Sequence, residues 1–435
     1  MLLYANGSKD TVITSEEMKQ GLFEVFNKLG NKKKVLAIPP DFTRFHSKAG
    51  ELTQCSYEYY GDKLTDILPA LGTHFEMTES EISKMFGDIP HELFRVHKWK
   101  SDLITLGRVP AEFINEVSEG KVNYDWPAQV NKLLVDGNFD LILSIGQVVP
   151  HEVVGMANYN KNIFVGTGGQ EGINKSHFLG AAYGMEKMMG RADTPVRKVL
   201  NYASDHFAKE LPILYIQSVI AKDENGKLVM RGLYIGDDYE CFELAAKLSL
   251  EVNFVMLDKP LDKIIVYLDS QEFKSTWLGN KAIYRTRMAI EDEGELIILA
   301  PGLKEFGEDK DIDKLIRKYG YLTTSEILKL VDEYDDLQNN LSAAAHLIHG
   351  SSENRFRITY CPGHISKEEI ESVNFNYADL NSMTKMYDPN KLKDGFNTTP
   401  NGEEIFYISN PALGLWAYKE RFTKNINGGK VEKCF

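Results

Sequence analysis

Two kinds of hydrophobic pattern alternate along the chain. Apolar residues recur at helical spacing between 18 and 29, and Thr14 with Glu17 forms a capping box ahead of them. The short apolar run 35–38 is closed by a proline pair, as expected of a buried strand that delivers a loop at its carboxyl end. We therefore expect the loop 41–48 to be well placed for function.

The same alternation continues through the first half of the chain. The apolar run 139–145 predicts a second buried strand, which leads into a loop that carries His151. The runs 213–220 and 227–235 flank a turn-like polar segment and predict an antiparallel hairpin, followed by a helix over 240–252. We expect the loops after the two buried strands to share one crevice.

A fresh βαβ pattern begins near residue 260. It consists of a predicted strand over 263–268, a helix over 279–290 and a strand over 294–300. The chain is also longer than one hydrophobic core usually organises. We therefore predict an α/β protein of two α/β domains with a cleft between them, the second domain smaller. The expected bounds are 1–258 for the first domain, 259–405 for the second, and 406–435 for a segment that packs back on the first.

Composition narrows the functional classes. The 435 residues carry a formal net charge of -13, which argues against nucleic acid as a partner because binding to a phosphate backbone needs a basic surface. No signal-peptide pattern or membrane-length apolar run is present, so we expect a cytoplasmic protein. The four cysteines lie far apart without CxxC spacing, which indicates reduced structural thiols: Cys55, Cys241, Cys361 and Cys434.

Three histidines stand in contexts that suggest chemistry, namely His74, His151 and His177. Taken singly, each is more often a hydrogen-bonded structural histidine than a ligand or a base. The same holds for Lys161, whose ordinary role is a solvated charge. The order and spacing of these four residues along the chain are a more specific signal of function than any one of the residues alone.

Taken together, these residues resemble the nickel-pincer lactate racemase family. Asp41-Phe42-Thr43-Arg44 after a strand is similar to the family's Asp-x-Thr-Arg signature, and Gly72-Thr73-His74 is similar to its Gly-Thr-His segment. Pro150-His151-Glu152 resembles the segment that supplies an opposing histidine. Lys161 follows ten residues later, at the position of the family's cofactor-bearing lysine, and His177 follows sixteen residues beyond that.

The resemblance implies a role for each position. Lys161 would bond covalently to a nickel-pincer nucleotide, which cofactor maturation proteins supply, and His177 would ligate the nickel. Asp41, Thr43 and Arg44 would hold the cofactor. His74 and His151 would be paired acid/base residues, and Lys281 would contact a 2-hydroxy acid substrate. Two bases suit a racemase, since the hydroxyl can lie on either side of the reaction centre, and histidine can move a proton both ways near neutral pH.

The sequence departs from the family where substrate is expected. Asn158, Tyr159 and Asn160 stand where the family commonly has Gly-Gly-Ala, and Leu278 replaces a glutamine. The expected tryptophan near 341 is missing, and His346 lies close by instead. We therefore predict substrate contacts from these five residues and a longer, polyhydroxy substrate such as a sugar acid inverted at C2.

Three alternatives stay open. One is a racemase of lactate or another small aliphatic hydroxy acid. A second is a zinc-dependent hydrolase in which His74, His151 and His177 hold the metal, although this leaves Lys161 without a role. The third is a non-catalytic protein that binds the nickel cofactor.

Overall fold

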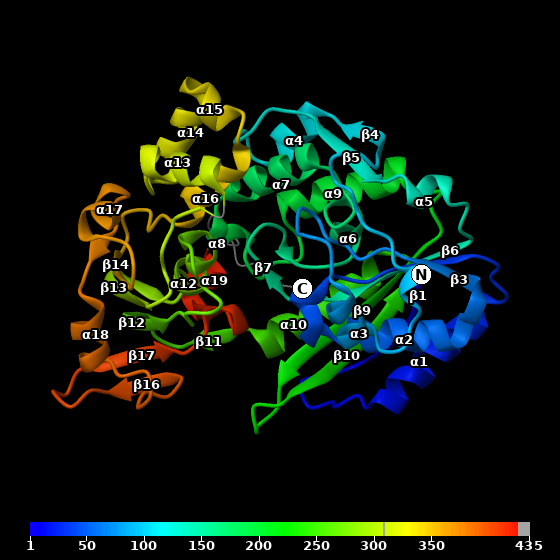
Figure 1. Cartoon of the computed structure of the whole chain (residues 1–435), viewed down its shortest axis with the longest axis horizontal. Helices are drawn as coiled ribbons and strands as arrows, with labels where there is room; N and C mark the ends of the chain where they lie inside the picture. Colours follow the sequence, from blue (N-terminus) through cyan, green and yellow to red (C-terminus); the bar gives the residue numbers. More distant parts are fainter. Residues whose placement is uncertain (308, 425–435) are drawn as a thin grey trace. The chain divides into compact units, whose positions relative to one another are not determined.

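The computed structural model describes residues 1–307 and 309–424 (Figure 1). The chain divides into two compact units. The N-terminal unit comprises Met1–Leu179 and Met188–Asn253, and the C-terminal unit comprises Gly180–Lys187 with the chain from Phe254 onward. Both units are α/β, as the sequence predicts. The division falls five residues before the expected boundary at 258, and the short stretch Gly180–Lys187 joins the C-terminal unit, which the sequence did not indicate.

A six-stranded mixed sheet organises the N-terminal unit. Its strands lie in the order β1-β10-β9-β6-β2-β3, and the four strands from β9 to β3 are parallel while β10 and β1 are antiparallel additions. The strands are β1 (Leu2–Gly7), β2 (Val35–Ile38), β3 (Leu64–Ile67), β6 (Leu141–Gln147), β9 (Ile213–Lys222) and β10 (Leu228–Gly236). The predicted hairpin is therefore β9–β10. Two smaller ribbons are β4 (Leu103–Val109) with β5 (Trp126–Asn131) and β7 (Pro150–His151) with β8 (Gly155–Met156).

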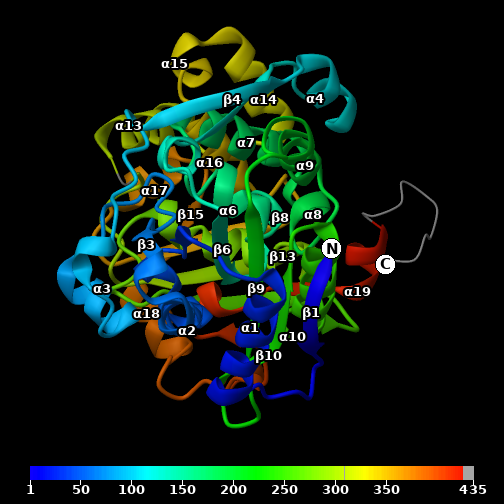
Figure 2. The same ribbon diagram turned by 90° about the vertical axis from the view of Figure 1, so that its right-hand side faces the viewer.

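Helices cover both faces of this sheet. The predicted first helix is α1 (Ser15–Leu29), and its capping box between Thr14 and Glu17 is present. α1 and α2 (Ala49–Tyr60) pack on the core that alternate strand residues form, and Figures 1 and 2 both show α1 alongside β1. The remaining helices are α3 (Glu79–Phe86), α4 (Ala111–Val117), α5 (Leu133–Asp136), α6 (Asn160–Phe164), α7 (Gln170–Tyr183), α9 (Pro195–Phe207) and α10 (Tyr239–Asn253). The last residues of α7 and most of α8 (Met185–Met188) fall in the stretch Gly180–Lys187 of the C-terminal unit.

The C-terminal unit has its own six-stranded sheet, in the order β15-β14-β13-β12-β17-β16. All neighbours are parallel except the β16–β17 pair. The six strands are β12 (Leu261–Tyr267), β13 (Ile290–Ala300), β14 (Arg357–Pro362), β15 (Asn376–Tyr377), β16 (Gly395–Thr398) and β17 (Glu404–Ile408). A separate two-stranded sheet pairs β11 (Val255–Leu257) with β18 (Trp416–Tyr418). The helices of this unit are α11 (Thr276–Gly279), α12 (Lys281–Thr286), α13 (Lys310–Tyr319), α14 (Thr324–Glu333), α15 (Asp335–Gln338), α16 (Leu341–His349), α17 (Lys367–Ser372), α18 (Leu380–Met386) and α19 (Lys419–Lys424).

Two expectations for this unit need correction. The helix predicted over 279–290 is instead two short helices, α11 and α12, which meet at Asn280. The part of 406–435 that the structure describes belongs to the C-terminal unit, where β18 pairs with β11 and Phe422 packs on Phe254, so this unit extends beyond the expected end at 405. Residues 425–435 lie outside the described residues.

Two further features follow from burial and length. Within 1–307 and 309–424, no helix combines the length and the apolar character that a bilayer crossing requires. Cys55, Cys241 and Cys361 are free and buried, and burial raises the pKa of each thiol, so they are inert structural side chains. Cys434 lies outside the described residues.

Candidate functional site

The loop after β2 places a carboxylate against a histidine. Asp41 caps the 3₁₀ helix Phe42–Ser47, and its carboxylate accepts hydrogen bonds from the backbone N–H and the hydroxyl of Thr43. Its other oxygen lies 2.6 Å from His74 Nδ1. Burial alone would raise the pKa of Asp41, but His74 and Thr43 lower it, so the carboxylate is ionised near neutral pH. Since a carboxylate only accepts, neutral His74 carries its proton on Nδ1 and keeps the Nε2 lone pair for a substrate proton.

His151 sits in a different environment. It is buried in β7, and the backbone N–H of Val153 donates to its Nδ1 over 3.1 Å. Neutral His151 therefore carries its proton on Nε2. Burial lowers the pKa of His151 well below its ordinary value; Lys161 and Arg44 lower it further, and Glu152, 3.9 Å away, opposes them. The two histidines thus differ in which ring nitrogen can accept a proton.

Lys161 lies at the second position of α6, at the carboxyl edge of the parallel strands. Burial lowers the pKa of Lys161 to about 8, and the positive charges of Arg44 and Arg197 add to the effect while Glu152 opposes it. At pH 7 about a tenth of this amine is thus unprotonated, far more than for an ordinary lysine. An unprotonated amine is the form that attacks a carbonyl, which fits a residue that forms a covalent bond to a cofactor.

We expect the Lys161 amine of the cofactor-free protein to react with a midpoint near pH 8. Above that pH the amine is neutral and nucleophilic, and below it the amine is protonated and inert. Reductive methylation over a pH series, followed by peptide mass spectrometry, measures the midpoint, with exposed Lys198 as an internal reference. In Arg44→Gln the midpoint should move upward, because a neighbouring positive charge is removed; an unchanged midpoint would contradict this account.

His177 is oriented for a ligand. It lies on α7, and its Nδ1 is 2.7 Å from the carbonyl oxygen of Ile173, so Nδ1 donates and Nε2 keeps a free lone pair. Burial lowers the pKa of His177, as does Lys161, which keeps the ring neutral. A neutral imidazole held through its other nitrogen is the usual arrangement for a metal-binding histidine.

The turn before Lys161 is strained, and its side chains contact neighbouring residues of the same unit. Asn158 and Tyr159 have φ values of 65° and 57°, the left-handed region, and for a tyrosine this is a true outlier. Each such residue costs on the order of 1–3 kcal/mol. Asn158 Nδ2 donates to Gln217 Oε1 over 2.8 Å, and Gly146 leaves room for it, since a Cβ there would lie 2.7 Å from Asn158 Oδ1.

The neighbouring side chains of this turn are also engaged. Tyr159 is buried among the rings of Tyr215, Tyr239 and Phe242. Asn160 is fully buried and donates to Asn201 Oδ1 over 2.7 Å. Their role as substrate contacts stays a prediction, and the contacts give them a second role in holding the turn.

The other predicted residues belong to the C-terminal unit. Lys281 is the first residue of α12, and its Nζ lies 5.8 Å from the ring centroid of Phe273. Leu278 is half-buried in α11.

His346 is buried in α16, and burial lowers its pKa to about 3. Its Nε2 lies 2.9 Å from Tyr321 Oη, and its ring lies 4.5 Å from that of Trp277. The sequence argument did not single out Trp277 or Tyr321. A tryptophan is therefore present beside His346, although not at the position where the sequence argument looked for one.

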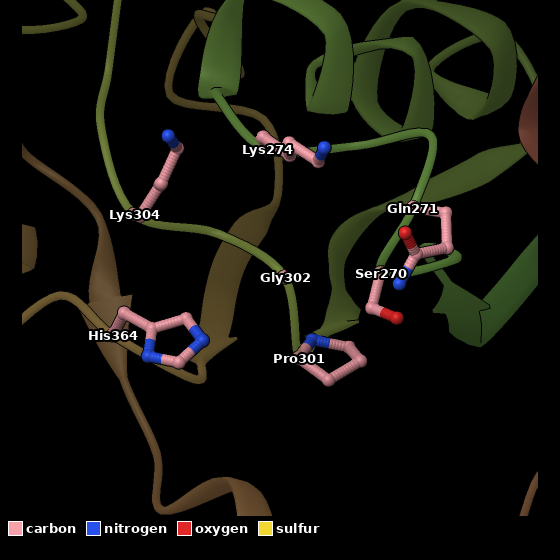
Figure 3. A pocket seen from close by; sticks show the side chains of 7 residues that line it. All are labelled: Ser270, Gln271, Lys274, Pro301, Gly302, Lys304 and His364. Carbon is pink, nitrogen blue, oxygen red and sulfur yellow. The ribbon is translucent and has the colours of Figure 1, made fainter.

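An open depression of about 360 Å³ lies at the carboxyl ends of β12, β13 and β14 (Figure 3). Lys274, Lys304 and His364 contribute its basic side chains from three successive loops. The loops are closely packed, because a Cβ on Gly363 would lie 2.0 Å from the Pro301 carbonyl oxygen. Sequence reasoning did not indicate this feature.

The residues of the N-terminal unit fit a lysine-tethered nickel cofactor better than a conventional zinc site. Within 1–307 and 309–424, no three His, Cys, Asp or Glu side chains lie close enough together to share a metal ion. The arrangement that the zinc hydrolase alternative needs is therefore not assembled there. A cofactor that brings its own donor atoms needs only one protein imidazole as a further metal ligand, and His177 Nε2 can provide it. The cofactor also needs an amine to form the covalent bond, and Lys161 can provide that amine.

Fold and site together define a two-unit α/β protein with a lysine–histidine site at the carboxyl edge of a parallel sheet. Residues 23–189 match the family model of the lactate racemase N-terminal domain. This part of the chain is therefore similar to the N-terminal domain of lactate racemases.

Two solved structures share the fold over nearly the whole chain. A crystal structure of a Thermotoga maritima protein is 27% identical, with a TM-score of 0.76, and the match covers 93% of this chain and 98% of that one. The lactate racemase apoprotein of Thermoanaerobacterium thermosaccharolyticum is 17% identical, with a TM-score of 0.70, and the match covers 93% of each chain. No curated protein matches the chain.

Proposed function

We propose that this chain is a racemase or epimerase that inverts the α-carbon of a 2-hydroxy acid, with a nickel-pincer nucleotide bound covalently to Lys161. The match of residues 23–189 to the lactate racemase N-terminal domain supports the coarse class, a hydroxy acid isomerase. The observation that carries the finer proposal is the proximity of a partly unprotonated, half-buried lysine to a histidine whose Nε2 is free for a metal. When bound, the nucleotide supplies the hydride acceptor that no amino-acid side chain provides.

The chain's own groups move the proton. His74, held by Asp41, accepts the hydroxyl proton of one stereoisomer at Nε2 and becomes an imidazolium, which can return that proton. His151 is proposed as the opposing acid/base: it takes the hydroxyl proton of the other stereoisomer, and only the imidazolium that this forms gives a proton back. Removal of the α-hydrogen makes the carbon planar, as in a 2-keto acid, so hydrogen can return to either face. Arg44 adds positive charge for an anionic phosphate, and Lys281 is proposed to bind the substrate carboxylate.

We also propose a cytoplasmic protein that cofactor maturation proteins load. The free buried thiols Cys55, Cys241 and Cys361 support a reducing compartment. Intact-mass measurement of protein purified from a host with the maturation proteins tests the tether. An adduct on Lys161 supports the proposal, whereas zinc alone and an unmodified lysine would favour the hydrolase alternative. An adduct without turnover of any hydroxy acid would favour a non-catalytic cofactor-binding protein.

The proposed substrate is a sugar acid inverted at C2 rather than lactate. The support is the set of departures from the family pattern at Leu278 and His346, together with the polar turn 158–160. We expect loaded protein, given a panel of 2-hydroxy acids from lactate to six-carbon aldonates, to turn over the longer acids faster. Chromatographic resolution of the stereoisomers measures this, and turnover confined to lactate would contradict it.

A further inference from the structure

The most unusual charge in the N-terminal unit is Arg197 on α9. Its side chain has no exposed surface, and in the part of the chain that the structure describes no carboxylate pairs with it. A buried guanidinium without a counter-ion is costly, and it persists only where several acceptors and aromatic faces replace the water that it has lost. The hydrogen-bond acceptors around Arg197 therefore indicate its role.

The acceptors of Arg197 all belong to the turn that precedes Lys161. Its Nη2 donates to the carbonyl oxygen of Met156 over 2.7 Å, and its Nη1 donates to the carbonyl oxygen of Asn158 over 3.3 Å and to Asn160 Oδ1. Its Cζ also lies 4.2 Å from the ring centroid of Phe242. One planar group thus holds both the main chain and a side chain of 156–160.

Two further residues of α9 complete the contact. Asn201 and Ser204 follow Arg197 by four and seven residues, which places all three on one side of the helix. Both accept hydrogen bonds from Asn160 Nδ2, over 2.7 and 3.2 Å. The turn itself contains the left-handed Asn158 and Tyr159, a conformation that needs outside support.

We propose that Arg197 is a positioning residue that holds the strained turn 156–160 and so aims Lys161 at the cofactor. This inference depends on the proposed function in one respect only, namely that the group bound to Lys161 is the nickel-pincer nucleotide. In a sequence with glycine at these two positions the turn would form without strain. Here asparagine and tyrosine stand there, and the guanidinium supplies the support.

The test uses hydrogen exchange of the cofactor-free protein, wild type against Arg197→Lys and Arg197→Met. Lysine keeps the charge but cannot reach three acceptors, so both variants should behave alike. The amides to follow are those of Ala157, Asn162 and Val165, which are hydrogen-bonded around the turn. Their exchange should accelerate by roughly tenfold or more, while the amides of the adjacent strand β6 stay protected. Arg95 is an exposed arginine that pairs with Asp66, and Arg95→Lys is the matched control. It should change the exchange of neither the turn amides nor the β6 amides.

A purely structural role gives a different pattern. If Arg197 only stabilises the unit as a whole, the β6 amides and the turn amides will accelerate together, and that result overturns the proposal, as does unchanged exchange in Arg197→Lys. Should both Arg197 variants fail to fold, Asn160→Ala removes one acceptor and leaves the guanidinium in place; its turn amides must then accelerate locally.

The consequence for the tether is measured separately. When the variants are produced with the maturation proteins, the adduct yield on Lys161 should fall in Arg197→Lys and remain at the wild-type level in Arg95→Lys. A wild type without any adduct would refute the proposed function, while the exchange experiment would still decide the role of Arg197 in the turn.

Discussion

Lys161→Ala will abolish the covalent adduct and the isomerase activity together. The loss of rate should be on the order of 10⁴-fold or more, because the variant loses the bond to the group that performs the hydride chemistry rather than one interaction among several. Intact mass reports the adduct, and chiral chromatography of the hydroxy acid reports the rate. The fold should survive, since the Lys161 side chain is not among the apolar residues of the core.

Lys198→Ala is the matched control for this experiment. Lys198 lies on α9 and pairs with Asp193 at the surface, so the variant should keep both the adduct and the rate. An adduct of the cofactor's mass that persists in Lys161→Ala would place the tether elsewhere. Activity that survives without any adduct would refute covalent attachment as a requirement.

His74→Ala and His151→Ala will each lower the rate by about 10²–10⁴-fold while the adduct on Lys161 remains. In the proposed mechanism each histidine takes the substrate proton of one stereoisomer and each is needed for inversion, so either loss slows inversion in both directions. Initial rates from each pure stereoisomer measure the effect, and intact mass confirms that loading is unchanged. His91→Ala, an exposed histidine bonded to Ser83, should leave the rate unaltered.

Either histidine variant at the wild-type rate would remove that residue from the mechanism.

Asp41→Asn separates orientation from proton transfer at His74. The amide keeps the volume but can present its NH₂ group to Nδ1, which favours the other tautomer and withdraws the Nε2 lone pair. Its rate should therefore fall although both histidines are intact.

Local patterns in the sequence predicted the elements that position the site. The buried strands β2 and β6, the capping box at Thr14 and the β9–β10 hairpin depend on short-range periodicity and capping chemistry, which a single sequence displays. The break at Asn280 was not predictable in this way. Its side chain accepts a hydrogen bond from Tyr360 over 2.8 Å, and a partner eighty residues away leaves no local trace.

The supporting residues of the site were missed for a related reason. Arg197, Asn201 and Ser204 form a polar line at helical spacing, which in a sequence normally indicates a solvated face. In the folded unit this line faces the turn before Lys161 instead. The replacement of small residues by Asn158 and Tyr159 was the available signal. A bulky residue where glycine is usual requires support from elsewhere, and a buried polar line is one form of that support.

The difference between His74 and His151 has a consequence for the energetics of turnover. Two enantiomers have equal free energy, so a lactate-type substrate obliges kcat/KM to be the same in both directions, however unlike the two bases are. Their different hydrogen-bond partners then affect only kcat and KM, in compensating amounts. Inversion at one of several stereocentres instead yields diastereomers of unequal energy, and kcat/KM must differ between directions by the equilibrium ratio. Forward and reverse progress curves would therefore report the class of substrate.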